Sequence, residues 1–313
     1  MDLPDRLLRS NWFIMQGQEP TEAFGKTAGG PMILLDGKKI SAQRRAVLKQ
    51  AVFDFSLQHG RSPTLAVILV GDNPASQVYV RNKQLACADV GLNSLKYHLE
   101  QDSSQQKVLQ QIQELNQNPT VDGILLQLPL PAQLNAEVLI EAIDPSKDVD
   151  GFTSTNLGRL LTGSKKAVLP CTPKGIVQLL KDYQIPLQGQ NVVVVGRSLI
   201  VGKPAGLLFL QENATVTFAH SKTQDLRRHL QQADIAIIAA GSVGFLRATD
   251  FKKGAVVIDV GIHRVQDRWM GDVNPEGLQD VLSAASPVPG GVGPMTITSL
   301  LENTLLLAQR RES

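Results

Sequence analysis

Apolar and polar residues follow two different periods along this chain. Residues 64–70 form an unbroken apolar run, rich in β-branched side chains, between Pro63 and Gly71, which is typical of a buried strand. Residues 104–116 instead place apolar side chains three and four positions apart, as in an amphipathic helix. Runs of both kinds alternate along most of the chain, so the pattern predicts strands and helices in turn.

The alternation indicates an α/β fold in which helices cover both faces of a parallel sheet. We expect Ser41 and Thr172 to cap helices, the latter with Pro173 at the first helical position. The predicted strands span residues 32–35, 64–70, 95–99, 121–126, 191–195, 215–219, 235–240 and 255–260. The predicted helices span residues 41–59, 76–90, 104–116, 135–143, 172–183, 202–212, 223–232 and 298–310.

The pattern is interrupted at residues 144–170, which are rich in Gly, Asp, Ser and Thr and which we interpret as a linker. A chain of 313 residues is long enough for about two domains. We predict a first, catalytic domain over 32–150, joined by a C-terminal helix at about 297–313. A Rossmann-like, doubly wound domain follows over 171–285, and a Pro/Gly-rich loop over 286–296 lies at the cleft between the two domains.

Residues 1–31 differ from the rest, because their short apolar pieces are broken by polar residues and a Gly/Pro/Glu-rich stretch follows. A secretory signal needs a basic start and 7–15 continuous apolar residues, and this segment has neither. We interpret it as a disordered N-terminal extension.

Composition narrows the class of protein. Hydrophobic residues make up 42% and charged residues 19%, as in an ordinary globular protein. The net charge of +2, without a basic cluster, argues against nucleic-acid binding, and no apolar run reaches the roughly 18 residues that span a membrane. The two cysteines and five histidines have no disulfide or metal-site spacing, so we expect no metal and a reducing compartment, the cytoplasm.

A candidate nucleotide site lies at residues 192–204, Val-Val-Val-Val-Gly-Arg-Ser-Leu-Ile-Val-Gly-Lys-Pro. A strand, a glycine turn and a helix start offer backbone N–H groups to a pyrophosphate. Ser198 replaces the second glycine of the usual fingerprint, so an ordinary βα turn remains an alternative. No acid follows about 20 residues later, where it would hold a ribose hydroxyl, and Arg197 lies in the turn, so the sequence favours NADP over NAD.

Candidate chemistry follows the predicted strands of the first domain. Tyr79 and Lys83 share a face near the start of a helix, where the lysine could handle protons and the ring could hold a flat substrate, although an exposed surface pair is an alternative. Gln127 ends a strand, where its amide could orient another group, although a loop-capping role is an alternative. Asp150 lies in a polar segment before Gly151, although an ordinary turn is an alternative. The glycines of the loop at 286–296 would let backbone approach a ligand closely, although a rigid connector is an alternative.

Together these motifs resemble one family. They are Tyr79-Val-x-x-Lys, Gln127-Leu-Pro-Leu-Pro, Lys147-Asp-Val-Asp-Gly-Phe, Pro170-Cys-Thr-Pro-Lys-Gly, Val195-Gly-Arg-Ser-x-x-Val-Gly-x-Pro and Pro287-Val-Pro-Gly-Gly-Val-Gly-Pro-Met-Thr. In this order, over about residues 32–310, the chain resembles the bifunctional methylenetetrahydrofolate dehydrogenase/methenyltetrahydrofolate cyclohydrolase family.

The resemblance implies two reactions in one cleft: NADP+ takes a hydride from 5,10-methylenetetrahydrofolate, and water then converts the methenyl product to 10-formyltetrahydrofolate. It implies that Lys83 manages protons, Gln127 positions it, Tyr79 stacks on the folate and Asp150 holds the pterin. The implied substrate contacts are Tyr79, Val80, Leu128, Asp150, Pro289, Gly290 and Gly291. The implied cofactor contacts are Gly196, Arg197, Ser198 and Ser221, with Ile262 and Thr296 at the nicotinamide end. The implied partners are tetrahydrofolate derivatives, polyglutamylated forms included, and a second copy of the chain in a homodimer.

Two other functions would also use the nucleotide half. A shikimate- or amino-acid-type NADP dehydrogenase would keep a catalytic lysine, but it would not require Gln127, Asp150 and the loop from Pro287 to Thr296 together. A non-catalytic NADP sensor would not require Tyr79 or Lys83.

Overall fold

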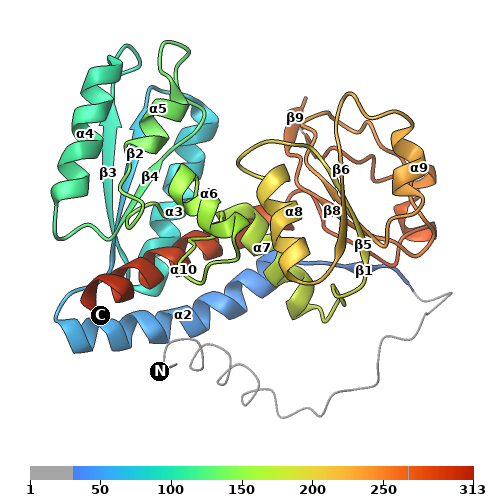
Figure 1. Cartoon of the computed structure of the whole chain (residues 1–313), viewed down its shortest axis with the longest axis horizontal. Helices are drawn as coiled ribbons and strands as arrows, with labels where there is room; N and C mark the ends of the chain where they lie inside the picture. Colours follow the sequence, from blue (N-terminus) through green and yellow to red (C-terminus); the bar gives the residue numbers. More distant parts are fainter. Residues whose placement is uncertain (1–30, 267) are drawn as a thin grey trace. The chain divides into compact units, whose positions relative to one another are not determined.

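The computed structural model describes residues 31–266 and 268–313. The extension predicted over residues 1–31 lies outside the described residues, apart from Pro31. Parallel strands form two separate sheets, shown with their helices in Figure 1. Among the described residues, no helix is long and apolar enough to cross a membrane.

The smaller sheet belongs to the first half of the chain. Its three strands lie in the order β3-β2-β4, with β2 (Thr64–Val70) between β3 (Asn93–Leu99) and β4 (Gly123–Leu126). All seven residues of β2 are buried, because helices cover both of its faces. The apolar run at 64–70 therefore forms the buried strand that the sequence predicted.

The larger sheet has six strands in the order β1-β11-β8-β7-β5-β6, all paired in parallel. Its strands are β1 (Ile33–Leu34), β5 (Asn191–Val195), β6 (Thr215–Ala219), β7 (Ile235–Ile238), β8 (Val256–Asp259) and β11 (Ala284–Ala285). This order, with the crossover at β5, confirms the predicted α/β class with a doubly wound parallel sheet. The first described strand, β1, lies at the edge of this sheet, although the sequence had grouped residues 32–35 with the first domain.

Helices connect and cover the strands. They are α2 (Gly37–His59), α3 (Pro74–Val90), α4 (Gln105–Gln117), α5 (Ala136–Glu141), α6 (Ser154–Leu161), α7 (Cys171–Asp182), α8 (Gly202–Gln211), α9 (Leu226–Leu230) and α10 (Val292–Glu312). An antiparallel hairpin of β9 (His263–Val265) and β10 (Arg268–Met270) follows β8. The sequence predicted neither this hairpin nor α6, which lies inside the segment interpreted as a linker.

Several helices do not begin where the sequence predicted, and three of these differences involve the expected caps or first turns. Asp36, not Ser41, caps α2 by accepting a 3.0 Å hydrogen bond from Lys39 N, while the Ser41 hydroxyl lies 2.7 Å from that of Thr298. Helix α7 begins at Cys171, so Thr172 lies within it. Helix α10 begins at Val292 rather than Thr298. Pro294 is compatible with this earlier start, because a proline in the first turn of a helix sacrifices no intrahelical hydrogen bond.

Helix α10 takes part in the hydrophobic cores of both halves. Its Val292 and Met295 pack with residues of α7, α8 and the larger sheet, whereas Leu301 and Leu305 pack with residues of α2, α3 and β2. Its Glu302 is also in ion pairs with two other helices.

These ion pairs connect α2, α7 and α10. Glu302 lies 3.0 Å from Arg44 of α2 and 2.9 Å from Lys174 of α7, and Arg44 lies 3.1 Å from Asp182. Burial alone would raise the pKa of Glu302, but the charges of Lys174 and Arg44 lower it to about 2. The carboxylate is therefore ionised throughout the neutral range and holds the three helices together.

Candidate active site

The carboxyl ends of β2 and β4 bring Lys83 and Gln127 together. Lys83 Nζ donates a 3.0 Å hydrogen bond to Gln127 Oε1. Lys83 lies in the middle of α3, not near its start as predicted, because the helix begins at Pro74. Gln127 directly follows β4, and its backbone N–H donates to Ile68 O of β2 at 2.9 Å.

The amide of Gln127 is held in one orientation. Its Nε2 donates to the carbonyl oxygen of Leu128 at 2.6 Å, so its Oε1 is the atom that faces Lys83. Gln127 is 8% exposed, and a buried amide with both of its ends bonded has little freedom to turn. The side chain can therefore fix the position of the lysine nitrogen.

Burial and charge shift the pKa values of Lys83 and Asp150 toward each other. Burial lowers the pKa of Lys83, and the charge of Asp150 opposes that shift. Burial raises the pKa of Asp150 to about 6, an effect that Lys83 reduces and Asp148 increases. Opposite shifts of this kind bring the proton affinities of an amine and a carboxyl group closer together, as is common for the acid–base groups of active sites.

The charged side chains of the segment Lys147-Asp-Val-Asp-Gly have different roles: two of them hold the turn, and the third faces Lys83. Asp148 accepts hydrogen bonds from the backbone N–H groups of residues 151–153, at 2.9–3.2 Å, and from the side chains of Thr153 and Asn156. Lys147 Nζ donates to the carbonyls of Leu115 and Asn118. These two buried charges fix the turn, and Asp150 is left to interact with Lys83.

The predicted folate contacts occupy different environments. Tyr79 lies one helical turn before Lys83 and is 38% exposed, so its ring is available to a ligand. Val80 is buried in the core of the first half, and Leu128 is half-buried. Contacts of Val80 and Leu128 with a substrate stay predictions.

Two thiols lie close to this pair, and the sequence had not included them in the site. Cys171 Sγ donates to Val149 O at 3.3 Å, and burial, followed by the charge of Asp150, raises its pKa. Burial raises the pKa of Cys87 to about 12. Both groups therefore remain neutral. Both are buried, and both are free, as their spacing in the sequence predicted. Signals for both were present: Cys87 lies four residues after Lys83, and Cys171 lies in the motif Pro170-Cys-Thr-Pro-Lys-Gly.

The glycine turn after β5 has the geometry of a phosphate cradle. Gly196 has φ 131°, and a Cβ there would lie 2.3 Å from Ala239 O. Within the described chain, the backbone N–H groups of residues 197–200 donate to no protein acceptor. Ser198 Oγ accepts from Val201 N and Gly202 N at the start of α8, and its own O–H remains able to donate. The turn therefore fits the pyrophosphate of a dinucleotide.

A backbone hydrogen bond positions the residues that are predicted to bind the 2′-phosphate. Gly196 N donates to Ala219 O, the last residue of β6, at 2.8 Å. The turn that carries Arg197 thus lies beside the segment 220–222, and both Arg197 and Ser221 are exposed. Cations and hydroxyls without a carboxylate suit a phosphate better than a ribose hydroxyl, so these residues fit NADP.

Two buried acids that the sequence analysis overlooked organise the loops after β7 and β8. Asp272 accepts from the backbone N–H groups of residues 240–242 at 2.7–2.9 Å. Asp259, at the end of β8, accepts from Asp272 N and Val273 N, and burial raises its pKa to about 6. Ile262 lies three residues after Asp259 and is 44% exposed. The sequence did contain a signal for Asp259, because this acid ends an otherwise apolar strand.

The Pro/Gly loop packs against the start of α2. Gly290 O accepts from Lys38 N at 3.0 Å, and Gly291 N donates to Pro287 O at 2.9 Å. Thr296 Oγ1 lies 3.0 Å from Thr172 Oγ1, which joins α10 to α7. The ligand contacts expected of Pro289, Gly290, Gly291 and Thr296 stay predictions.

Comparison with protein families gives two matches that together cover most of the chain. The family described as tetrahydrofolate dehydrogenase/cyclohydrolase, catalytic domain, matches residues 35–150. The one described as tetrahydrofolate dehydrogenase/cyclohydrolase, NAD(P)-binding domain, matches residues 170–312.

Individual relatives match along nearly their whole length. The bifunctional protein FolD of Halalkalibacterium halodurans is 50% identical over 277 residues, which cover 88% of this chain and 99% of the relative. The crystal structure of the bifunctional enzyme FolD, methylenetetrahydrofolate dehydrogenase/cyclohydrolase, from Campylobacter jejuni has a TM-score of 0.87 at 47% identity, over 90% of this chain and 99% of that one. The Trypanosoma brucei N5,N10-methylenetetrahydrofolate dehydrogenase-cyclohydrolase, in complex with NADP cofactor and an inhibitor, has a TM-score of 0.87 at 33% identity, with the same coverage.

Proposed function

Because this chain belongs to the tetrahydrofolate dehydrogenase/cyclohydrolase family, we propose that Lys83, Gln127 and Asp150 carry out the chemistry of its two reactions. The enzyme oxidises 5,10-methylenetetrahydrofolate with NADP+ and hydrolyses the 5,10-methenyl product to 10-formyltetrahydrofolate. The observation that carries the proposal is the 3.0 Å hydrogen bond between Lys83 Nζ and Gln127 Oε1.

The hydrolysis requires a group that both accepts and donates a proton. Water adds to the methenyl carbon and loses a proton, and the bond from that carbon to one ring nitrogen then breaks as the nitrogen gains a proton. The lowered pKa of Lys83 supplies neutral amine for the first transfer, and the resulting ammonium can donate in the second. Gln127 keeps Nζ at one place during both transfers.

The oxidation depends on alignment more than on proton transfer. When bound, NADP+ accepts the hydride from the methylene carbon. Arg197, Ser198 and Ser221 hold the 2′-phosphate, Gly196 lets the turn approach the pyrophosphate, and Ile262 and Thr296 contact the nicotinamide end. Tyr79 stacks on the folate, and Asp150 accepts hydrogen bonds from the amino-pyrimidine edge of the pterin, together with contacts from Val80, Leu128, Pro289, Gly290 and Gly291.

The oligomeric state and the cellular location of this protein are proposed from its resemblance to the same family. We propose a homodimer in the cytoplasm, acting on tetrahydrofolate derivatives with or without polyglutamate tails. The free, buried state of Cys87 and Cys171 supports a reducing compartment. Light scattering on the purified protein should give twice the mass of one chain, and a single-chain mass would contradict the dimer.

The two activities can be measured on one sample. Purified protein, 5,10-methylenetetrahydrofolate and NADP+ should yield NADPH and 10-formyltetrahydrofolate in equal amounts, with the methenyl compound as a transient. Methenyl compound supplied directly should be hydrolysed without cofactor turnover. NADPH formation that leaves the methenyl product unhydrolysed would show that Lys83 and Gln127 do not serve the second reaction.

A further inference from the structure

A pocket of about 320 Å³, apart from the candidate active site, lies where the C-terminal end of α10 meets α6 and the turn before Asp148. Its lining residues are Pro145, Ser146, Arg159, Lys166, Leu307, Arg310 and Arg311. Four of these seven residues are cations and none is acidic. None of them belongs to the site described above, so this concentration of positive charge needs its own explanation.

Most of these cations have neutral partners. Arg310 donates to the backbone carbonyls of Lys165 and Lys166, at 3.0 and 2.9 Å, and Arg159 donates to the amide oxygen of Asn156 at 3.2 Å. Arg311 is the exception, because it lies 2.9 Å from the carboxylate of Asp122. Over the part of the chain that the structure describes, Arg159, Lys166 and Arg310 have no ion-pair partner.

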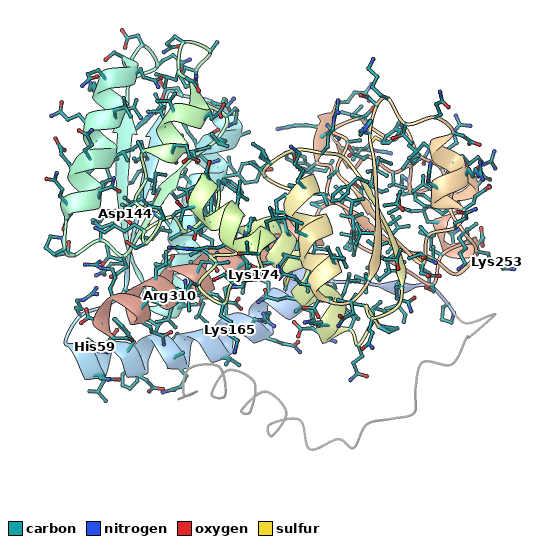
Figure 2. The ribbon with its side chains drawn as sticks, viewed as in Figure 1. His59, Asp144, Lys165, Lys174, Lys253 and Arg310 are labelled. Atoms are coloured by element: carbon teal, nitrogen blue, oxygen red, sulfur yellow. The ribbon has the colours of Figure 1, made fainter. Side chains whose placement is uncertain are left out.

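The positive charges also repel one another. Burial, and then the charge of Arg159, lower the pKa of Arg310. For Asp144, burial alone would raise the pKa, but hydrogen bonds from Ser146 and the charges of Lys147 and Arg311 lower it. The Asp144 carboxylate is already engaged by Ser146, at 2.7 Å from both its N–H and its hydroxyl. Figure 2 labels Arg310, Lys165 and Asp144 around this region.

We propose that this pocket binds a small anion of the phosphate class, held by Arg159, Lys166 and Arg310. Guanidinium groups present paired donors that match the oxygens of a phosphate, and a bound anion would relieve the repulsion between the two arginines. A pocket of about 320 Å³ holds a phosphate together with a small organic group, which Leu307 and Pro145 would contact. The site is separate from the cofactor's phosphate contacts at Arg197.

Calorimetric titration of the full chain with inorganic phosphate and with pyrophosphate tests this proposal. The protein is first saturated with NADP+, so that the cofactor's own phosphate contacts are filled. We expect saturable binding at one site, which Lys166→Gln and Arg310→Gln each weaken about tenfold or more, as the loss of a charge-assisted hydrogen bond requires. Lys253→Gln, which removes an exposed lysine of the other half, should leave binding unchanged.

Three results would overturn the proposal: no saturable binding, equal weakening by Lys253→Gln, or tighter binding of citrate than of pyrophosphate, which would indicate a carboxylate site. Arg310→Gln also frees two backbone carbonyls, so Lys166→Gln is the decisive variant, because its side chain makes no hydrogen bond within the described residues. A thermal melt of each variant confirms that it is folded.

Discussion

Lys83 donates its hydrogen bond to an amide, Gln127, and not to a carboxylate. A neutral acceptor fixes the position of the amine without adding negative charge that would stabilise the ammonium form. Burial can therefore lower the pKa of Lys83, which is what proton transfer near neutral pH requires.

Gln127→Glu should reverse this effect, because it places a carboxylate within reach of Lys83 at nearly unchanged volume. An adjacent opposite charge shifts a pKa by about 1–3 units, so the ammonium should persist to higher pH. We expect methenyl hydrolysis to fall at least about tenfold near pH 7 and to recover partly as the pH rises. The measurement is the rate against pH after subtraction of the uncatalysed reaction, and an unchanged profile would contradict the role given to the amide.

Asp150→Asn should change the pH dependence of stability. The folded pKa of about 6 lies above the ordinary 3.8, so the folded protein favours the protonated carboxyl, and that contribution is lost as the pH rises through 6. Since one pKa unit corresponds to about 1.4 kcal/mol, the variant should gain up to about 3 kcal/mol over wild type at about pH 8 and little near pH 4.

Thermal melts across this pH range measure that difference, with Asp148→Asn as the matched control. Asp148 accepts several backbone and side-chain hydrogen bonds, so its replacement should destabilise the protein through the loss of those bonds. A difference between Asp150→Asn and wild type that does not vary with pH would show that Asp150 is not the titrating group.

Cofactor selectivity should depend on Arg197. A hydrogen bond to a charged group contributes about 1.5–3 kcal/mol, so Arg197→Ala should weaken NADP+ binding roughly ten- to a hundredfold. NAD+ lacks the phosphate and should be affected much less. Fluorescence titration with both cofactors on the same variant measures the two constants, and equal weakening would mean that Arg197 shapes the turn instead of binding the phosphate.

Gly196, in the turn after β5, should not tolerate substitution, whereas Gly206, inside helix α8, should. An added Cβ at Gly196 would lie 2.3 Å from the backbone oxygen of Ala239, whereas one at Gly206 would lie 2.1 Å from the tip of the Phe218 ring. Because Phe218 is 44% exposed, its ring can be displaced at a lower cost than the backbone of Ala239. Gly196→Ala should therefore cost about 1–3 kcal/mol and abolish the rise in melting temperature with NADP+. Gly206→Ala should retain that rise, and similar losses in both variants would show that the cradle is not specific to Gly196.

Much of the fold was predictable because its strands are continuous apolar runs. The residues of β2, β5 and β7 stand out in the sequence since both faces of each strand are covered. Helix α6 and the β9–β10 hairpin escaped prediction, because α6 is short and depends on the cap from Thr153, and the hairpin is largely exposed.

The sequence predicted which residues form the site, but it did not predict which of them are structural and which face Lys83. Asp148 and Asp150 are equivalent in the sequence, and only the fold directs one to backbone N–H groups and the other to Lys83. The structural carboxylates of Asp259 and Asp272 were missed for a similar reason, because their partners lie on separate loops.

Lys83→Met tests the central claim most directly, because methionine keeps much of the side-chain volume and removes the proton-handling group. Methenyl hydrolysis and NADPH formation are measured separately, with a thermal melt, an NADP+ titration and the exposed-lysine variant Lys107→Met as controls. We predict that hydrolysis falls about 10²–10⁴-fold, while folding and NADP+ binding are retained and Lys107→Met behaves as wild type. Hydrolysis at a near wild-type rate in folded Lys83→Met protein would contradict the account.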